Sequence, residues 1–142
     1  MEGKMKFIVV GCGNIAQRCS IPALMHSGVT EVVCVVDTDE RKRGLVAEKF
    51  GVPFETELKK VLDTYEFESV YISTPNAVHV QIVEQVAPYG KNILCEKPLA
   101  GTREDAVRIA ELGKQYNVPI FEGFMYQFHT QHKLKNQMIA DG

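Results

Sequence analysis

A short apolar run that ends in a glycine-rich turn is the feature that most limits what this chain can fold into. Residues 6–11 (KFIVVG) have the composition of a buried strand, and residues 11–16 (GCGNIA) follow with the spacing G-x-G-x-x-A. In this pattern Gly11 permits a tight turn and Gly13 lets a phosphate approach the backbone, while Ala16 allows close packing of the next helix on the strand. The free N–H groups that begin such a helix attract phosphate. The pattern therefore predicts a dinucleotide site after the first strand.

The rest of the chain alternates between apolar runs of strand length and segments with apolar residues at helical spacing. This order predicts right-handed crossovers and a parallel sheet covered by helices. The fold class is α/β, a doubly wound parallel sheet (Rossmann fold), in a single domain over residues 1–142. We expect strands at residues 6–11, 31–37, 52–54, 69–72, 92–95 and 119–124, and helices beginning near residues 14, 39, 56, 76, 102 and 131.

Local signals refine the expected helices. Pro22 should kink or break the first of them, since proline lacks the N–H that a helix needs. Thr56 and Thr102 are expected to cap the helices that follow them. Apolar spacing places Leu45 and Ala110 on buried faces of their helices.

Composition excludes several classes of protein. The chain has 142 residues, 45% of them hydrophobic, and a formal net charge of -2, which is unlike a nucleic-acid or membrane-surface footprint. No run of ~18 apolar residues exists, and the first residues have no signal-peptide core. The cysteines form no CxxC pair, so we expect neither a disulfide framework nor a zinc site. We therefore expect a cytoplasmic protein; its four cysteines are Cys12, Cys19, Cys34 and Cys95.

Asp37 bears on the choice of cofactor. It ends the second predicted strand about 20 residues after the glycine turn, where a carboxylate accepts hydrogen bonds from the adenosine ribose. Such a carboxylate favours NAD, while a basic side chain at Arg41–Arg43 can accept the 2′-phosphate of NADP. A solvated helix start is the other interpretation of these basic residues, so NAD is expected and NADP is left open. The cofactor-binding residues predicted in this half are Gly11, Cys12, Gly13, Asn14, Ile15, Asp37, Thr38 and Arg41.

Four segments occur in an order that resembles one enzyme family. They are the glycine turn, Ser73-Thr74-Pro75-Asn76 with His79, Glu96-Lys97-Pro98, and Glu122-Gly123-Phe124-Met125-Tyr126. Together they resemble the glucose-fructose oxidoreductase/inositol 2-dehydrogenase (Gfo/Idh/MocA) family, over the whole chain. The stretch from Gly123 to His129 is similar to its dihydrodiol and sugar dehydrogenase branch, except that Gln127 stands where related sequences commonly have arginine.

The resemblance implies roles for individual residues. Lys97 would assist proton transfer at the substrate beside the nicotinamide, and Glu96 would line the cofactor together with Ser73, Thr74, Pro75 and Asn76. Transfer of a hydride from an alcohol requires a base for the hydroxyl proton, and a partly desolvated lysine beside the cationic ring would have the lowered pKa that such a base needs. His79 is counted with this cofactor loop, and we expect it to pack and hydrogen-bond rather than to catalyse.

The resemblance also implies a substrate and a second domain. The substrate would be a sugar, polyol or dihydrodiol carrying a secondary alcohol or carbonyl. Family members continue into a substrate domain, so residues 125–142 would be the crossover toward it, and we expect this chain to lack that domain and to be inactive alone. A non-catalytic dinucleotide-binding regulator or partner subunit is the alternative. A methyltransferase-like nucleotide site fits less well with Asp37 and Glu96-Lys97-Pro98.

An aromatic cluster in the last third of the chain indicates self-association. Four aromatic residues fall between residues 121 and 128, and part of this set should point away from the sheet. The helix over residues 131–141 either folds back over them or leaves them for a second copy, and we favour a homo-oligomer. His129 and His132 lie at helical spacing but have no evident third ligand, so no metal is expected.

Overall fold

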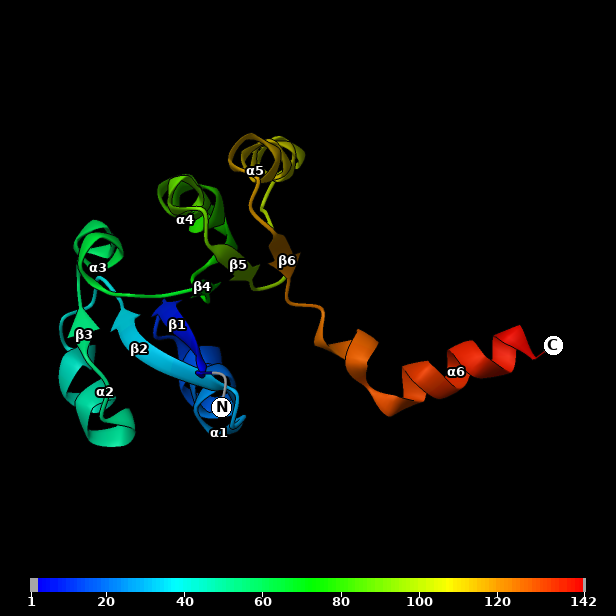
Figure 1. Cartoon of the computed structure of the whole chain (residues 1–142), viewed down its shortest axis with the longest axis horizontal. Helices are drawn as coiled ribbons and strands as arrows, with labels where there is room; N and C mark the ends of the chain where they lie inside the picture. Colours follow the sequence, from blue (N-terminus) through cyan, green and yellow to red (C-terminus); the bar gives the residue numbers. More distant parts are fainter. Residues whose placement is uncertain (1–2, 142) are drawn as a thin grey trace.

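The computed structural model describes residues 3–141 and has a parallel sheet of six strands in the order β3-β2-β1-β4-β5-β6 (Figure 1). The expected α/β doubly wound fold is confirmed; the two ends of the expected 1–142 range lie outside the described residues. The strands are β1 (Met5–Val10), β2 (Thr30–Val36), β3 (Phe54–Glu55), β4 (Ser69–Ile72), β5 (Asn92–Cys95) and β6 (Ile120–Glu122). Strand β1 pairs with β2 on one side and with β4 on the other. The chain therefore builds the sheet outward in one direction from β1 to β3 and in the opposite direction from β4 to β6, and the order reverses between β1 and β4.

Helices cover both faces of the sheet (Figure 1). The α-helices are α1 (Ile21–His26), α2 (Lys42–Phe50), α3 (Leu58–Thr64), α4 (His79–Val86), α5 (Arg103–Tyr116) and α6 (Thr130–Ala140). Shorter turns are η1 (Ala16–Ser20), η2 (Asn76–Val78), η3 (Ala87–Tyr89) and η4 (Met125–Phe128). Helices α3, α4 and α5 lie on one face, and α1 and α2 on the other. No helix within residues 3–141 is long and apolar enough to span a membrane.

Each face of the sheet has its own apolar core. On the α3–α5 side, Ile8 and Ile72 are fully buried with residues of those helices, and on the other side Val9 and Val35 pack with Ile21 of α1. Successive residues of a strand point to opposite faces, so strands covered on both sides are apolar throughout. This explains the nearly unbroken apolar runs of the sequence.

Three local expectations can be compared with the structure. The first helix has the expected irregularity at Pro22: the preceding turn η1 is π-helical, which accommodates a ring without an N–H. Thr102 caps α5 as expected, since its hydroxyl accepts a hydrogen bond from the Asp105 N–H at 3.1 Å. Thr56 does not cap α3; the cap position is Glu57, and its side chain makes no capping bond.

Two residues expected on buried helix faces are exposed. Leu45 is 40% exposed, because α2 turns only Val46 fully toward the sheet. On α5, Ala110 is exposed and Leu112 is buried in the core. In both helices the apolar residue one or two positions away provides the packing contact.

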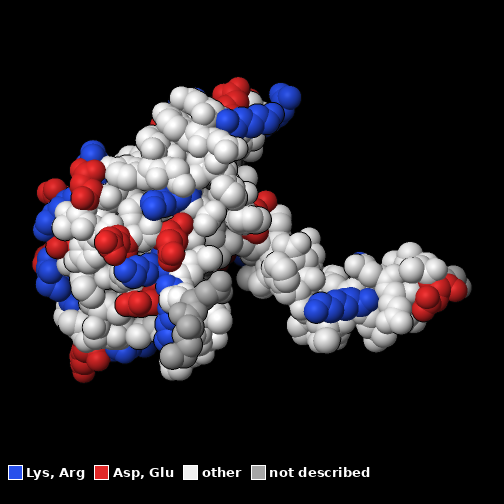
Figure 2. Space-filling model, in the orientation of Figure 1, with Lys and Arg blue, Asp and Glu red and all other residues white. Residues whose placement is uncertain are grey.

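The segment formed by η4 and α6, which we call the C-terminal arm, extends away from the sheet (Figure 1). Its α6 does not fold back over the aromatic residues, contrary to one of the two expected arrangements. Phe128 is 76% exposed, and α6 buries none of its residues. On the face seen in Figure 2, acidic and basic side chains intermingle over the sheet domain, and the arm carries few of either.

Candidate functional site

A groove of about 740 Å³ opens at the carboxyl ends of β1, β2 and β4. It lies where the strand order reverses, which is the usual ligand site of an open α/β sheet, and its volume is typical of a small-molecule site. Residues from loops and from helix faces line it: Val10, Gly11, Gly13, Val36, Asp37, Thr38, Asp39, Lys42, Thr56, Leu58, Ser73, Thr74, Pro75, Val78, Gln81, Ile82 and Gln85.

The two glycines of the turn have different structural roles. Gly11 has a φ of +96°, and a Cβ there would lie 2.7 Å from the Ser73 carbonyl oxygen, so glycine is needed for the loops after β1 and β4 to meet. A Cβ on Gly13 would meet no atom within 4 Å. The space beside Gly13 is thus open toward the groove, as a site for an approaching phosphate requires. Ala16 is fully buried against the sheet, as the sequence pattern predicts.

Asp37 is the centre of a hydrogen-bond cluster at the end of β2. Its Oδ2 accepts bonds from the Cys12 N–H and from the Lys42 ammonium, both at 2.7 Å, and its Oδ1 accepts the Asp39 N–H at 2.9 Å. Burial alone would raise the pKa of Asp37, but these three donors favour the carboxylate and hold its pKa below the ordinary value. The carboxylate therefore stays charged at neutral pH.

Cys12 ties the glycine turn to the end of β2. Its side chain is fully buried and its N–H is donated to Asp37, so neither group is free for a phosphate. Asn14 and Ile15 are exposed at the start of the helix, where N–H groups lack partners within the helix. Cys34 and Cys95 are buried like Cys12, whereas Cys19 is exposed.

Of the basic residues near Asp37, Lys42 rather than Arg41 faces the groove. The Arg41 guanidinium binds Asp39 at 2.8 Å and is 90% exposed, outside the groove lining. Arg43 bonds to Glu40 and to the Phe54 carbonyl. The first side chain of α2, Lys42, is thus the basic group turned toward Asp37, and the role expected of Arg41 stays a prediction.

The loop after β4 forms the opposite wall. Ser73, Thr74 and Pro75 line the groove, and the Ser73 N–H bonds to the Val10 carbonyl at 2.8 Å. Within residues 3–141, the Thr74 hydroxyl is the one buried side-chain polar atom without a hydrogen-bond partner. Asn76 is exposed next to this wall. Together with the open space at Gly13, these features fit a polar ligand laid across the loops.

His79 lies beneath the loop rather than in the groove. It is 1% exposed, and its two ring nitrogens lie 3.0 Å from the Thr74 carbonyl and 3.1 Å from the Leu99 carbonyl. This agrees with the packing and hydrogen-bonding role expected from the sequence. It also means that the ring does not reach a ligand in the groove.

Glu96 and Lys97 follow β5 at the same edge of the sheet, beyond the groove lining. The Glu96 carboxylate accepts a bond from the Tyr71 hydroxyl at 2.5 Å and from the Lys97 N–H at 3.2 Å. Burial, and secondly this bond to Glu96, raise the pKa of Tyr71, which stays a neutral donor. Lys97 is exposed, and its ammonium forms no ion pair within the part of the chain that the structure describes.

Several groove residues were not predicted from the sequence. Leu58, Val78 and Ile82 provide apolar walls, and Gln81 and Gln85 add amides from α4. In the sequence these residues have the spacing of amphipathic helices, which gives no sign that part of each helix faces a ligand site.

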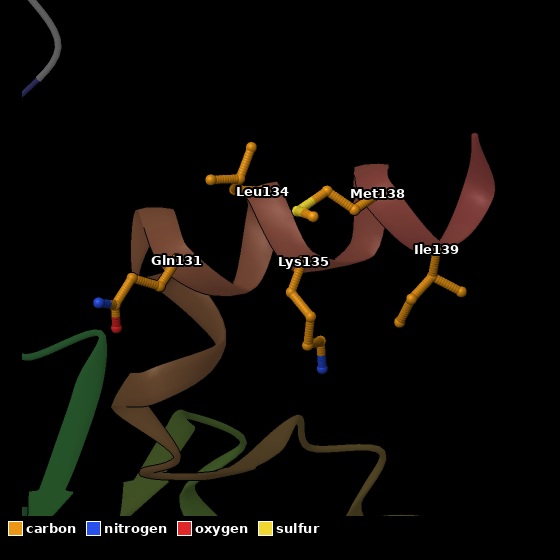
Figure 3. Close-up of a pocket in the computed structure, with 5 residues that line it drawn as sticks. All are labelled: Gln131, Leu134, Lys135, Met138 and Ile139. Carbon is orange, nitrogen blue, oxygen red and sulfur yellow. The ribbon is translucent and has the colours of Figure 1, made fainter. Parts of the chain in front are cut away.

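A second hollow lies along helix α6 of the C-terminal arm (Figure 3). It is lined by Gln131, Leu134, Lys135, Met138 and Ile139 of α6 alone. Figure 3 shows Leu134 and Met138 on one side of the helix and Lys135 and Ile139 on the other. The nearby His129 accepts the Gln131 N–H at 3.2 Å as a helix cap. No cluster of three metal-ligating side chains occurs within residues 3–141.

Comparisons with known proteins agree with this geometry. Residues 5–124 match the Gfo/Idh/MocA profile, described as "Oxidoreductase family, NAD-binding Rossmann fold". The dTDP-3,4-didehydro-2,6-dideoxy-alpha-D-glucose 3-reductase of Streptomyces antibioticus is 31% identical over 98% of this chain and 42% of its own length.

Two solved structures resemble the whole fold. The WlbA dehydrogenase of Bordetella pertussis, in complex with NADH and UDP-GlcNAcA, has a TM-score of 0.89 at 25% identity, covering 98% of this chain and 42% of that one. The 3-ketoreductase KijD10 of Actinomadura kijaniata, in complex with NADP and TDP-benzene, has a TM-score of 0.89 at 27% identity, with coverage of 99% and 43%. The chain thus spans about two fifths of the length of the relatives it matches.

Proposed function

The chain belongs to the Gfo/Idh/MocA oxidoreductase family, and from that membership we propose that it binds a nicotinamide dinucleotide in the groove and supplies Lys97 for proton transfer. The reaction would interconvert a secondary alcohol and a carbonyl. The observation that carries the proposal is that Gly13, Asp37 and the 73–75 loop open into one groove at the reversal of strand order.

Different groove residues would bind different parts of the cofactor. Gly13 and the helix that begins at Asn14 would hold the pyrophosphate. Asp37, Thr38 and Lys42 would meet the adenosine ribose, where the carboxylate suits a ribose diol and the ammonium suits a 2′-phosphate. NAD is therefore the proposed cofactor, and NADP remains compatible with the site. The apolar walls at Leu58, Val78 and Ile82 would receive the adenine.

The loop after β5 would serve the reacting end. A bound nicotinamide accepts or donates the hydride. The hydroxyl proton of an alcohol must leave at the same time, and the Lys97 amine would take it; in the reverse direction the ammonium would polarise the carbonyl. Glu96, held by Tyr71, would line the cofactor beside Lys97.

The substrate class follows from the relatives. Their names include a reductase of a dTDP-linked keto sugar and a dehydrogenase in complex with UDP-GlcNAcA. We propose a carbohydrate carrying a secondary alcohol or carbonyl. Residues 1–142 would form the cofactor-binding unit, with the segment from about residue 125 leading toward the part of the enzyme that holds the substrate.

Titration calorimetry with NADH and with NADPH tests the proposal. We expect saturable binding of NADH, weakened by roughly 1–3 kcal/mol in Asp37→Ala, which leaves ribose hydroxyls unpaired. The absence of both heat and a thermal shift at millimolar cofactor would refute the proposal. An unchanged affinity in Asp37→Ala would move the ribose away from Asp37.

A further inference from the structure

We infer that Glu122 is a positioning residue for Lys97 and acts through the backbone of Leu99. The inference rests on the proposed function, because it concerns how Lys97 is held against the bound nicotinamide. Glu122 ends β6 and lies opposite Cys95 in the parallel register of β5 and β6. Its side chain therefore projects at the same edge of the sheet as the loop that carries Lys97.

Both polar backbone groups of Leu99 are held by side chains of other elements. The Leu99 N–H is donated to Glu122 Oε1 at 2.8 Å, and the Leu99 carbonyl oxygen lies 3.1 Å from His79 Nδ1. We call Glu122 and His79 the Leu99 clamp. The clamp fixes the chain two residues after Lys97, from a strand on one side and from a helix on the other.

His79 also ties the clamp to the groove. Its Nε2 lies 3.0 Å from the carbonyl oxygen of Thr74, a residue of the groove wall. Both ring nitrogens of His79 are thus within hydrogen-bond distance of a carbonyl oxygen, and a ring nitrogen bonds a carbonyl when it carries the hydrogen. The buried ring thus joins the loop after β4, which lines the groove, to the loop after β5.

Lys97 itself depends on this support. Its side chain is exposed, and within the described residues no hydrogen bond or ion pair holds its ammonium. The preceding residue, Glu96, is anchored by the Tyr71 hydroxyl. Lys97 therefore lies between two anchored residues, and the backbone alone sets the direction in which its side chain leaves the loop.

The sheet does not need the Glu122 carboxylate. Backbone bonds join β5 and β6, and the Gly123 N–H adds a bond to the Cys95 carbonyl at 2.7 Å. No lysine or arginine pairs with Glu122 among residues 3–141. A half-buried carboxylate costs desolvation, and here its recorded partner is one loop N–H, a charge-assisted bond that is stronger than a neutral one. Its position accordingly serves the loop.

The test follows the Lys97 side chain by NMR. Reductive methylation with ¹³C-formaldehyde labels the lysines and keeps their charge, and Lys97→Arg assigns the Lys97 signal. NADH is titrated into the wild-type chain, Glu122→Ala and Glu122→Gln, whose amide oxygen can still accept the Leu99 N–H. Glu111→Ala, an exposed acid of α5, is the matched control. Hydrogen exchange at the Leu99 amide is measured in parallel.

We expect Glu122→Ala to bind NADH within threefold of the wild type, because Glu122 is outside the groove, and to lose at least half of the NADH-induced Lys97 shift. Leu99 exchange should rise at least tenfold. Glu111→Ala should retain the wild-type values, and Glu122→Gln, which keeps the bond but not its charge, should fall between the wild type and Glu122→Ala. Where the alanine variant does not fold, Glu122→Asp, which withdraws the carboxylate by one methylene, takes its place with the same expectation.

Two outcomes separate the clamp from the proposed function. A full Lys97 shift or unchanged Leu99 exchange in Glu122→Ala overturns the clamp. A wild-type chain that binds NADH without any Lys97 shift, or does not bind it, overturns the proposed role of Lys97, and the Leu99 exchange rates then decide the clamp alone.

Discussion

The ammonium of Lys42 lies 2.7 Å from Oδ2 of Asp37, so the carboxylate that ends β2 already has a cation beside it. A carboxylate at this position favours the ribose diol of NAD and repels the 2′-phosphate of NADP. The lysine changes that balance, since its flexible stem can carry the charge from the carboxylate to a phosphate. The pair thus combines a group suited to each cofactor in one place.

Lys42→Ala should therefore shift the cofactor preference toward NADH. Loss of a charged hydrogen bond to the 2′-phosphate should weaken NADPH by about 1–2 kcal/mol relative to NADH, or roughly 5- to 30-fold. Calorimetric titrations with both cofactors measure the ratio. Arg41→Ala is the control: Arg41 pairs with the groove residue Asp39, but its own side chain is 90% exposed and does not line the groove, so the ratio should stay unchanged. A loss of NADPH binding in Arg41→Ala but not in Lys42→Ala would assign the 2′-phosphate to Arg41, the residue predicted from the sequence.

The two glycines of the turn should respond differently to alanine. Gly13→Ala places a methyl group in open space, so the free energy of unfolding should change by less than about 1 kcal/mol, while NADH binding is lost to the obstructed phosphate approach. Gly11→Ala combines a φ of +96° with a contact of 2.7 Å to Ser73, and should destabilise the fold itself by about 1–3 kcal/mol. Urea unfolding and NADH titration separate the two effects. Equal losses of stability would contradict this division.

Stability should depend on pH through Asp37. Its pKa in the folded state is below the ordinary value near 4, so folding is favoured by the charged form above that pH, and this contribution is lost as the pH falls through the folded pKa. In Asp37→Asn the contribution is absent at every pH. The difference in free energy of unfolding between wild type and variant should therefore shrink from pH 6 to pH 3, as measured in urea. A difference that grows on acidification would mean that Asp37 is destabilised as a carboxylate.

Much of the fold could be predicted because its signals are local. Apolar strand runs, the glycine turn and the Thr102 cap each depend on neighbouring residues, and the sheet follows from their order. Lys42 was harder to assign, because three consecutive basic residues look alike in sequence and the first turn of α2 decides which one faces Asp37. The clamp at Leu99 joins residues far apart in the chain, so the spacing of Glu122 and His79 carries no sign of it. The hydrogen bonds that Glu122 and His79 make to Leu99 can be recognised only when the three-dimensional positions of the strands are known.

We expect negligible turnover by this chain alone with sugars, polyols or dihydrodiols. Lys97 can contribute about 10²–10⁴-fold through proton transfer, but it is exposed and outside the groove, and held positioning can account for ~7–11 kcal/mol of a barrier. Formation of NADH is followed by its absorbance. Lys97→Ala should keep its NADH affinity within about twofold, as expected of a side chain outside the groove. Multiple turnovers that Lys97→Ala abolishes would show that the chain holds its substrate unaided.

We finally expect the chain to self-associate through its C-terminal third. Phe121, Phe124, Tyr126 and Phe128 are 60%, 39%, 53% and 76% exposed. Helix α6 extends away from the sheet and touches this set where the His132 ring packs on Tyr126, with ring centroids 5.0 Å apart. A cluster of exposed apolar side chains on a monomer favours burial against another protein surface. In a pure sample the surface available is that of a second copy of the chain. Light scattering at micromolar concentration should give a mass above 15.9 kDa that falls toward it in Phe124→Ser/Phe128→Ser. Val29→Ser, which removes an exposed apolar side chain before β2, is the control. A monodisperse species of 15.9 kDa would refute the association, and an oligomer that persists in the double variant would place the interface on another face.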